Sequence, residues 1–169
     1  MLAQTHSYMN QQEVEVNAYP KQIAFNVIPF VHSFNDNGYT KEEMKMVWET
    51  HKILDENINV NATAVRVPVI TGHSESITIE TKKPVDIDLL KDRFRALEYI
   101  KLLDDPSKNE YPTAVTDGSG TDHVYVGRIR KDLENDNILN IWVVADNVRK
   151  GAALNSIQIA ELLIEGDYL

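Results

Sequence analysis

The segment ESITIET, residues 75–81, alternates cleanly, with isoleucines at positions 77 and 79 between polar side chains. Successive side chains of a β-strand point to opposite faces of a sheet, so this alternation predicts a strand. A second extended run covers residues 60–70, and we expect the two runs to pair antiparallel through a turn at residues 71–74. Further strands are expected at residues 14–16, 22–28 and 100–103, and in the segments HVYVGRIRKD and ILNIWVVAD.

Helices are predicted between these strands. Thr40 and Glu43 fit a capping box, in which each side chain binds a backbone N–H that is left free at a helix start. Apolar residues then recur at helical spacing as far as Leu54. A proline and an acidic first turn predict a helix over residues 86–96, and a last helix is expected over residues 149–164.

The order of these elements lacks the strict strand–helix–strand rhythm of a parallel doubly wound sheet. We therefore expect an α+β fold with a mixed, largely antiparallel sheet and helices. No glycine-rich phosphate loop follows a strand, so the chain carries no complete dinucleotide-binding domain of its own. Residues 1–12 show no clear period and are expected to be a poorly ordered leading segment before one domain at residues 13–169.

The composition argues against several classes of function. A formal net charge of −9 over 169 residues disfavours nonspecific nucleic-acid binding, which needs clustered Lys and Arg. No segment approaches the roughly 18 uncharged apolar residues of a membrane span. A cysteine count of 0 excludes disulfides, thiolate metal sites and a cysteine nucleophile within this chain. No basic and then apolar leader is evident, so we expect a cytoplasmic protein.

Arg66 is the first candidate for a binding role. Val60, Ala62, Ala64 and Pro68 share its parity, whereas Val65, Val67 and Val69 occupy the other face. Small neighbours leave room above the guanidinium, whose planar fork can hold a carboxylate with two hydrogen bonds. The alternative is that an Asp or Glu of this chain occupies that room, since charged residues in strands are usually paired internally.

His73 is the candidate for proton transfer. It lies in a Gly-His-Ser turn, and an imidazole with an ordinary pKa of about 6.5 can accept and return protons at neutral pH. The alternative is a solvent-exposed turn histidine. The other histidines lack recurring metal-ligand spacing, so no metal site is expected.

Two further groups of residues can contribute. Glu42 and Lys45 share one face of the helix that starts after Thr40, so both can point at one site or form a solvated ion pair. In the segment ADNVRKGAALN, Asp146 or Asn147 can cap the last helix, and such a helix start can receive an anion or a cofactor amide. A capped and packed helix, however, needs no ligand.

Five blocks of the chain together resemble successive parts of the C-terminal half of bacterial aspartate-semialdehyde dehydrogenases. The blocks are YPKQIAFNVIPF, KEEMKMVWETHKIL, VRVPVITGHSESITIET, VYVGRIRKD and NIWVVADNVRKGAALNSIQIAELL. They occur in the order of the family and extend over residues 13–163. The resemblance implies a substrate-binding and dimerisation domain like the C-terminal domain of glyceraldehyde-3-phosphate dehydrogenase, without the N-terminal NADP-binding domain.

The resemblance also implies an activity and roles for residues. Members of this family reduce β-aspartyl phosphate to aspartate semialdehyde through a cysteine thioester, in the biosynthesis of lysine, threonine and methionine. By the motif match, Arg66 holds the substrate carboxylate and His73 is the acid/base catalyst. Lys45 binds phosphate with Glu42 beside it, and Asn147 touches NADP. The nucleophilic cysteine belongs to the missing half, so we expect no turnover by this chain alone.

Three hypotheses follow. The leading one is the substrate-binding and dimerisation portion of an NADP-dependent aspartate-semialdehyde dehydrogenase, which acts as a homodimer on aspartate semialdehyde and phosphate. The second is a noncatalytic dimerisation module derived from the same family. The third is a related reductase of another acyl phosphate, similar to the N-acetylglutamyl phosphate reductases. The blocks KEEMK and GHSES favour the aspartate enzyme, because they match its substrate-side motifs more closely.

Overall fold

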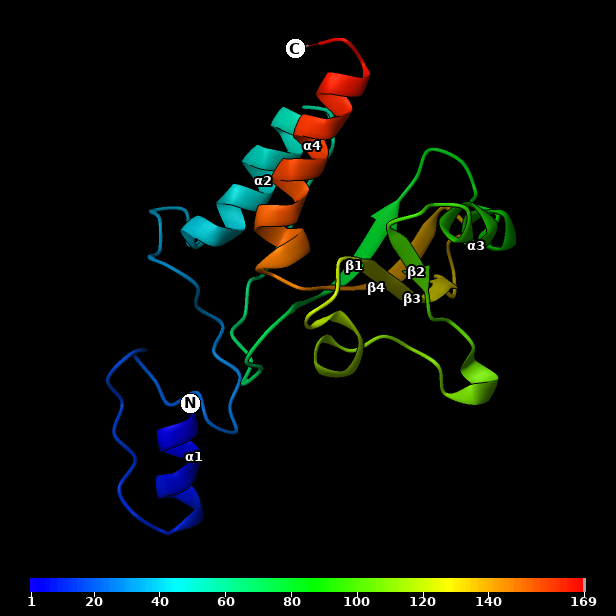
Figure 1. Ribbon diagram of the computed structural model, residues 1–169. Helices are drawn as coiled ribbons and strands as arrows, with labels where there is room; N and C mark the ends of the chain where they lie inside the picture. Colours follow the sequence, from blue (N-terminus) through cyan, green and yellow to red (C-terminus); the bar gives the residue numbers. More distant parts are fainter. Residues whose placement is uncertain (169) are drawn as a thin grey trace. The chain divides into compact units, whose positions relative to one another are not determined.

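The computed structural model describes residues 1–168 (Figure 1). The chain divides into two compact units, Met1–Pro68 and Val69–Leu169. The expectation of one domain over residues 13–169 stays a prediction. The division falls directly after the block that carries Arg66 and before the turn that carries His73.

The first unit begins with α1, Leu2–Met9, within the segment that the sequence predicted to be poorly ordered. Tertiary contacts connect α1 to the rest of the unit. The Gln4 side chain accepts hydrogen bonds from the backbone N–H groups of Ile23 and Ala24, at 3.1 and 3.3 Å, and both of these residues are buried. Helical periodicity alone did not reveal α1, because tertiary packing supplies most of the stability of short helices.

The next helix, α2, spans Lys41–Ile53 and has the predicted capping box. The Thr40 hydroxyl accepts a hydrogen bond from the Glu43 N–H at 3.3 Å, and the Glu43 carboxylate accepts one from the Thr40 N–H at 2.7 Å. Thr40 and Glu43 are both buried, so this start of the helix is fixed inside the unit.

The strands predicted at residues 14–16, 22–28 and 60–70 are absent from the described chain, and these predictions were wrong. Only an isolated antiparallel bridge joins Ile28 to Arg66. Alternating sequence predicts an extended backbone, but a strand also needs a partner along its length. Val65 and Val67 remain exposed, and Pro68 cannot donate a hydrogen bond.

The second unit is built on one sheet with strand order β1-β4-β3-β2. β1 pairs antiparallel with β4, β4 pairs antiparallel with β3, and β2 runs parallel to β3. The mixed, largely antiparallel sheet of the prediction is therefore present, although β1 pairs with β4 and not with residues 60–70. The strands are β1 His73–Glu80, β2 Ile100–Leu102, β3 Val124–Lys131 and β4 Ile138–Ala145.

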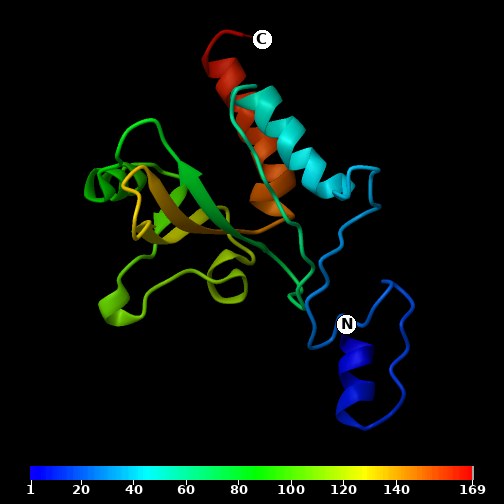
Figure 2. The same ribbon diagram turned by 180° about the vertical axis from the view of Figure 1, so that it is seen from behind.

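The core of this unit lies between the sheet and α3, Ile87–Arg95. Asp86 caps α3 by accepting hydrogen bonds from two backbone N–H groups of the first turn. Leu90 and Phe94 of the helix pack against a cluster of buried side chains, which consists of Val126, Ile129, Leu139 and Ile141. Figures 1 and 2 show α3 beside one end of the sheet, whereas the chain leaves the opposite end toward α4.

Short helical turns replace part of the loop that was predicted to be irregular. They are a 3-10 turn at Pro106–Lys108 and a π-turn at Ala114–Gly118. Another π-turn, Arg149–Ala153, precedes α4, Leu154–Glu165, in the region of the predicted last helix. Among residues 1–168, no helix combines the length and the apolar character that crossing a membrane requires.

Candidate active site

Arg66 is anchored through its backbone, and its guanidinium contacts an aromatic ring. Its N–H donates to the Ile28 carbonyl at 2.8 Å, and its own carbonyl accepts from the Ile28 N–H at 3.0 Å. The half-buried guanidinium lies over the Tyr19 ring, with its central carbon 4.9 Å from the ring centroid. No carboxylate forms an ion pair with Arg66 among residues 1–168. The internal pairing considered as the alternative is therefore not observed.

The exposure pattern around Arg66 agrees with the parity argument from the sequence. Ala62 and Ala64 are half-buried like Arg66, and the intervening residues are exposed. The face with small side chains is thus the inner one. A guanidinium above small neighbours, with a cation–π contact to hold it, can accept a carboxylate ligand from outside the unit.

Glu42 and Lys45 of α2 form the ion pair that was considered as the alternative to a shared ligand site. The Lys45 ammonium lies 3.5 Å from Glu42 Oε2, and the same oxygen lies 3.1 Å from His32 Nδ1. The Lys45 side chain is 48% exposed, so its charge remains accessible to an anion. His32 was not singled out from the sequence, because nothing in a loop histidine indicates which carboxylate it will meet.

His73 is the first residue of β1 and is exposed. It is the register partner of Ala145 at the end of β4, so it lies beside the segment that begins with Asp146 and Asn147. The preceding Gly72 has φ +100°, a conformation that L side chains rarely adopt. Among residues 1–168, no carboxylate pairs with the His73 ring, which leaves it open to solvent or to a ligand.

Asn147 is tied directly to the turn that carries His73. Its Oδ1 accepts a hydrogen bond from the Gly72 N–H at 2.8 Å. The neighbouring Asp146 is buried, and its carboxylate accepts from the backbone N–H groups of Arg149, Gly120 and Val148. The N–H groups of Arg149 and Gly120 hold the pKa of Asp146 below its ordinary value. Asp146 therefore holds the backbone that leads into the last helical segment, and Asn147 links that backbone to the turn before β1.

Arg66, Glu42 and Lys45 belong to the first unit, whereas His73 and Asn147 belong to the second. The structure brings Glu42 and Lys45 together in one unit and His73 and Asn147 together in the other. The prediction that Arg66 and His73 face one shared pocket stays a prediction.

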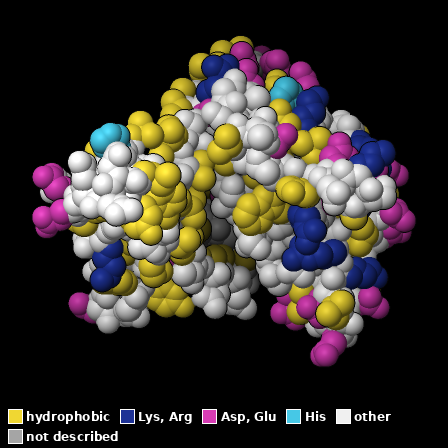
Figure 3. Space-filling model, turned by 90° about the horizontal axis from the view of Figure 1, so that it is seen from below, with side chains coloured by type: hydrophobic (Ala, Val, Ile, Leu, Met, Phe, Trp, Pro, Cys, Tyr) yellow, Lys and Arg dark blue, Asp and Glu magenta, His cyan; other side chains and the backbone are white. Residues whose placement is uncertain are grey.

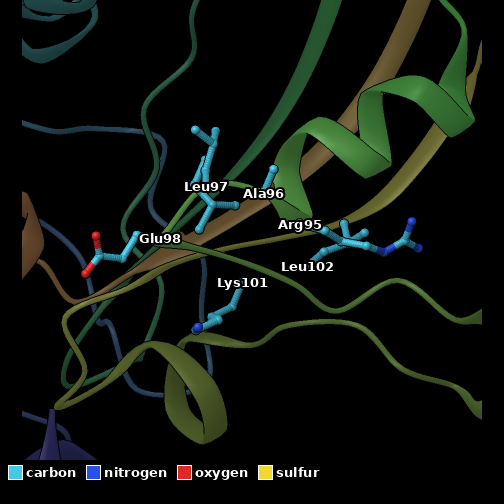
Figure 4. A pocket seen from close by; sticks show the side chains of 7 residues that line it. Arg95, Ala96, Leu97, Glu98, Lys101 and Leu102 are labelled. Atoms are coloured by element: carbon cyan, nitrogen blue, oxygen red, sulfur yellow. The ribbon is translucent and has the colours of Figure 1, made fainter.

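A surface pocket of about 370 Å³ lies elsewhere, at the turn between α3 and β2. Figure 4 shows that the side chains of Arg95, Glu98 and Lys101 point in different directions around it. Polar groups of a ligand site converge on one point, and these diverge. Arg95 is also neutralised by Asp92 at 2.7 Å. This pocket is not the candidate site.

The comparisons with known proteins agree with this architecture. The family described as "Semialdehyde dehydrogenase, dimerisation domain" matches residues 1–150, and the chain belongs to it. A curated "Aspartate-semialdehyde dehydrogenase" of Shewanella violacea is 59% identical over 155 residues, which are 91% of this chain and 45% of the relative. The chain spans about half the length of the curated relatives it matches.

Solved structures give the same result. A structure of aspartate semialdehyde dehydrogenase II complexed with ASA from Vibrio cholerae has 50% identity and a TM-score of 0.92, covering 99% of this chain and 49% of that one. Another, of aspartate semialdehyde dehydrogenase with NADP from Candida albicans, has 27% identity and a TM-score of 0.65, covering 87% and 46%. These matches confirm the resemblance to this family. They also confirm the predicted α+β fold class, which is like the C-terminal domain of glyceraldehyde-3-phosphate dehydrogenase.

Proposed function

We propose that this chain supplies the substrate-binding and acid/base residues of an NADP-dependent aspartate-semialdehyde dehydrogenase. The observation that carries the proposal is Arg66, a half-buried guanidinium without a carboxylate partner in the part of the chain that the structure describes. An unpaired, partly desolvated cation favours an anionic ligand. Membership in the semialdehyde dehydrogenase family supports a semialdehyde that carries a carboxylate as this ligand.

The proposed roles divide by chemistry. Arg66 binds the substrate carboxylate with two hydrogen bonds, and Lys45, kept in place by Glu42, binds phosphate. His73 removes a proton from the attacking thiol and returns one when the tetrahedral intermediate collapses. The cysteine count of this chain is 0, so the thiol comes from a separate polypeptide or from a portion of the protein outside this sequence.

The residues at the start of the last helical segment fit a cofactor amide. Because the Asn147 Oδ1 accepts from Gly72, its amide orientation is fixed, and its Nδ2 hydrogens have no acceptor among residues 1–168. NADP supplies the hydride acceptor when it is bound. Asn147 would hold it through Nδ2, while its oxygen keeps the Gly72 turn in place.

The test is reconstitution with a cysteine-bearing N-terminal portion of the Shewanella violacea or Vibrio cholerae relative. The two polypeptides are mixed with aspartate semialdehyde, phosphate and NADP, and NADPH formation is followed. We expect turnover by the pair and none by either part alone. A matched mixture with His73→Asn should lose about 10² to 10⁴ in kcat. An assembled pair without turnover, or one that His73→Asn leaves unchanged, would contradict the proposal.

A dimerisation role without catalysis is the second candidate. The description of the matching family favours it, together with the exposed apolar side chains among the charged ones on the face drawn in Figure 3. Sedimentation equilibrium at micromolar concentration tests dimer formation, and a strict monomer would contradict it. A dimer that gives no turnover with the cysteine-bearing portion would favour this candidate over the enzyme.

A further inference from the structure

Glu43 is a buried carboxylate that none of the roles above uses. It is 7% exposed and lies in the first turn of α2, between Glu42 and Lys45 in the sequence. Both of its oxygens are occupied. Oε2 accepts from the Thr40 N–H at 2.7 Å, and Oε1 accepts from the Ala64 N–H at 2.9 Å. The second bond joins positions 21 residues apart in the sequence.

Only the first of these bonds belongs to a capping box. Thr40 and Glu43 complete the reciprocal cap without help from any other segment. The bond to Ala64 is a separate connection, from the start of α2 to the segment that ends at Arg66. Because two residues span at most about 7 Å of extended chain, fixing Ala64 also restricts where the backbone of Arg66 can lie.

This hydrogen bond therefore joins the two segments that carry the proposed anion-binding cations of the first unit, Lys45 and Arg66. Glu42 and Lys45 are on α2 beside Glu43, and Arg66 follows Ala64 closely. On its other side, Arg66 is held by its two backbone hydrogen bonds to Ile28. The backbone of Arg66 is thus restrained from both directions.

We propose that Glu43 is a positioning residue, whose carboxylate sets the spacing between the Arg66 guanidinium and the Lys45 ammonium. The proposal rests on the proposed function, in which these cations bind the carboxylate and the phosphate of one reaction. Small errors in such spacing reduce catalysis strongly, since a displacement of about 1 Å can cost roughly 100-fold in rate.

The informative substitution is Glu43→Gln, which preserves size and packing. A carboxamide has one oxygen, so it can accept from Thr40 or from Ala64, and its NH₂ group then faces the other N–H. The matched control is Thr40→Ala. It removes the hydroxyl that caps the Glu43 N–H, but it leaves the Thr40 N–H and both bonds accepted by the Glu43 carboxylate in place.

The first measurement uses the reconstituted enzyme at a temperature where both variants are folded. We expect Glu43→Gln to raise KM for aspartate semialdehyde and for phosphate by about 10-fold each. Thr40→Ala should leave both KM values within about 2-fold of the parent. Its melting temperature should fall, because the substitution removes a helix cap. Equal KM values in the two variants, with matched losses of stability, would show that Glu43 acts on stability alone and would overturn the proposal.

The second measurement separates this proposal from the proposed function. If the unsubstituted pair gives no NADPH, the proposed function fails, and the positioning is judged in this chain by amide hydrogen exchange. Faster exchange at Ala64 and Arg66 in Glu43→Gln, but not in Thr40→Ala, supports the link between the two segments. Unchanged exchange at both amides in Glu43→Gln would overturn it.

Discussion

In the proposed role of Arg66, charge and geometry contribute separately to binding. Arg66→Lys keeps the positive charge but loses the planar fork, so one carboxylate can no longer be held by two parallel hydrogen bonds. We expect KM for aspartate semialdehyde to rise by about 10-fold or more in the reconstituted enzyme, with little change in melting temperature. Arg95→Lys is the control, since Arg95 is exposed on α3 and pairs with Asp92. Similar kinetics in the two variants would contradict the role of Arg66.

The sequence was sufficient to single out the candidate residues, but not their partners. The alternation along residues 60–66 correctly predicted that Arg66 lies on the same face as the small residues Ala62 and Ala64. Helical spacing correctly gave the Glu42–Lys45 pair. His32 beside Glu42 and Asn147 beside Gly72 could not be predicted, because these contacts join residues that the sequence separates. Tertiary structure alone decides which of several loop residues meet.

Asn147 has a structural contribution that can be measured without the missing cysteine. Asn147→Ala removes the acceptor of the half-buried Gly72 N–H. An unsatisfied donor of this kind costs about 1 kcal/mol in the free energy of unfolding. Urea unfolding of this chain should show that loss, with faster exchange of the Gly72 amide. Asn155→Ala on α4 is the control, because it removes only an exposed acceptor, that of the Lys150 ammonium. An equal effect of both substitutions would contradict the link from Asn147 to the turn before β1.

At the scale of elements, the sequence correctly predicted the helices and strands that local interactions stabilise. The capping box of α2 is present, α3 lies within the helix predicted over residues 86–96, and β3 and β4 lie within the predicted runs. The wrong predictions concern which strands pair. Residues 60–70 have strand-like alternation but form only one bridge, and β1 pairs with β4 and not with residues 60–70. Pairing over a long sequence separation depends on the whole sheet, which alternation in one segment does not encode.

The turn into β1 gives a prediction of its own. A Cβ at Gly72 would lie 3.0 Å from Ala114 Cβ and 3.3 Å from its carbonyl oxygen, and φ is +100°. Gly72→Ala therefore has a crowding cost in addition to backbone strain of about 1–2 kcal/mol. Gly120→Ala is the matched control in the same unit, because φ there is +77° and nothing lies within 4 Å. Denaturant unfolding should show a clearly larger loss for Gly72→Ala, and equal losses would contradict the crowding at Ala114.

At the scale of the whole molecule, carboxylates in both units are held ionised by local donors. Lys108 and then Ser107 lower the pKa of Asp105 from 3.8 to about 2. The N–H groups of Thr40 and Ala64 lower the pKa of Glu43 from 4.5. The pKa values of Asp122 and Asp146 are lowered as well, by hydrogen bonds from Arg149 in each case. Each carboxyl group therefore binds its proton more readily in the unfolded chain than in the folded one.

The sign of the resulting pH dependence follows from linkage. Between the folded and the unfolded pKa values the unfolded state holds more protons, so the free energy of unfolding rises with pH in that window. Stability should be nearly constant above pH of about 5 and should fall as the pH decreases from about 4.5 toward 2. Urea midpoints measured across this range test the prediction. Asp105→Asn should lessen the acid-side loss, because it removes the group whose pKa is lowered to about 2. A midpoint that stays constant down to pH of about 2.5 would contradict the lowered pKa values, since no group would then take up more protons on unfolding.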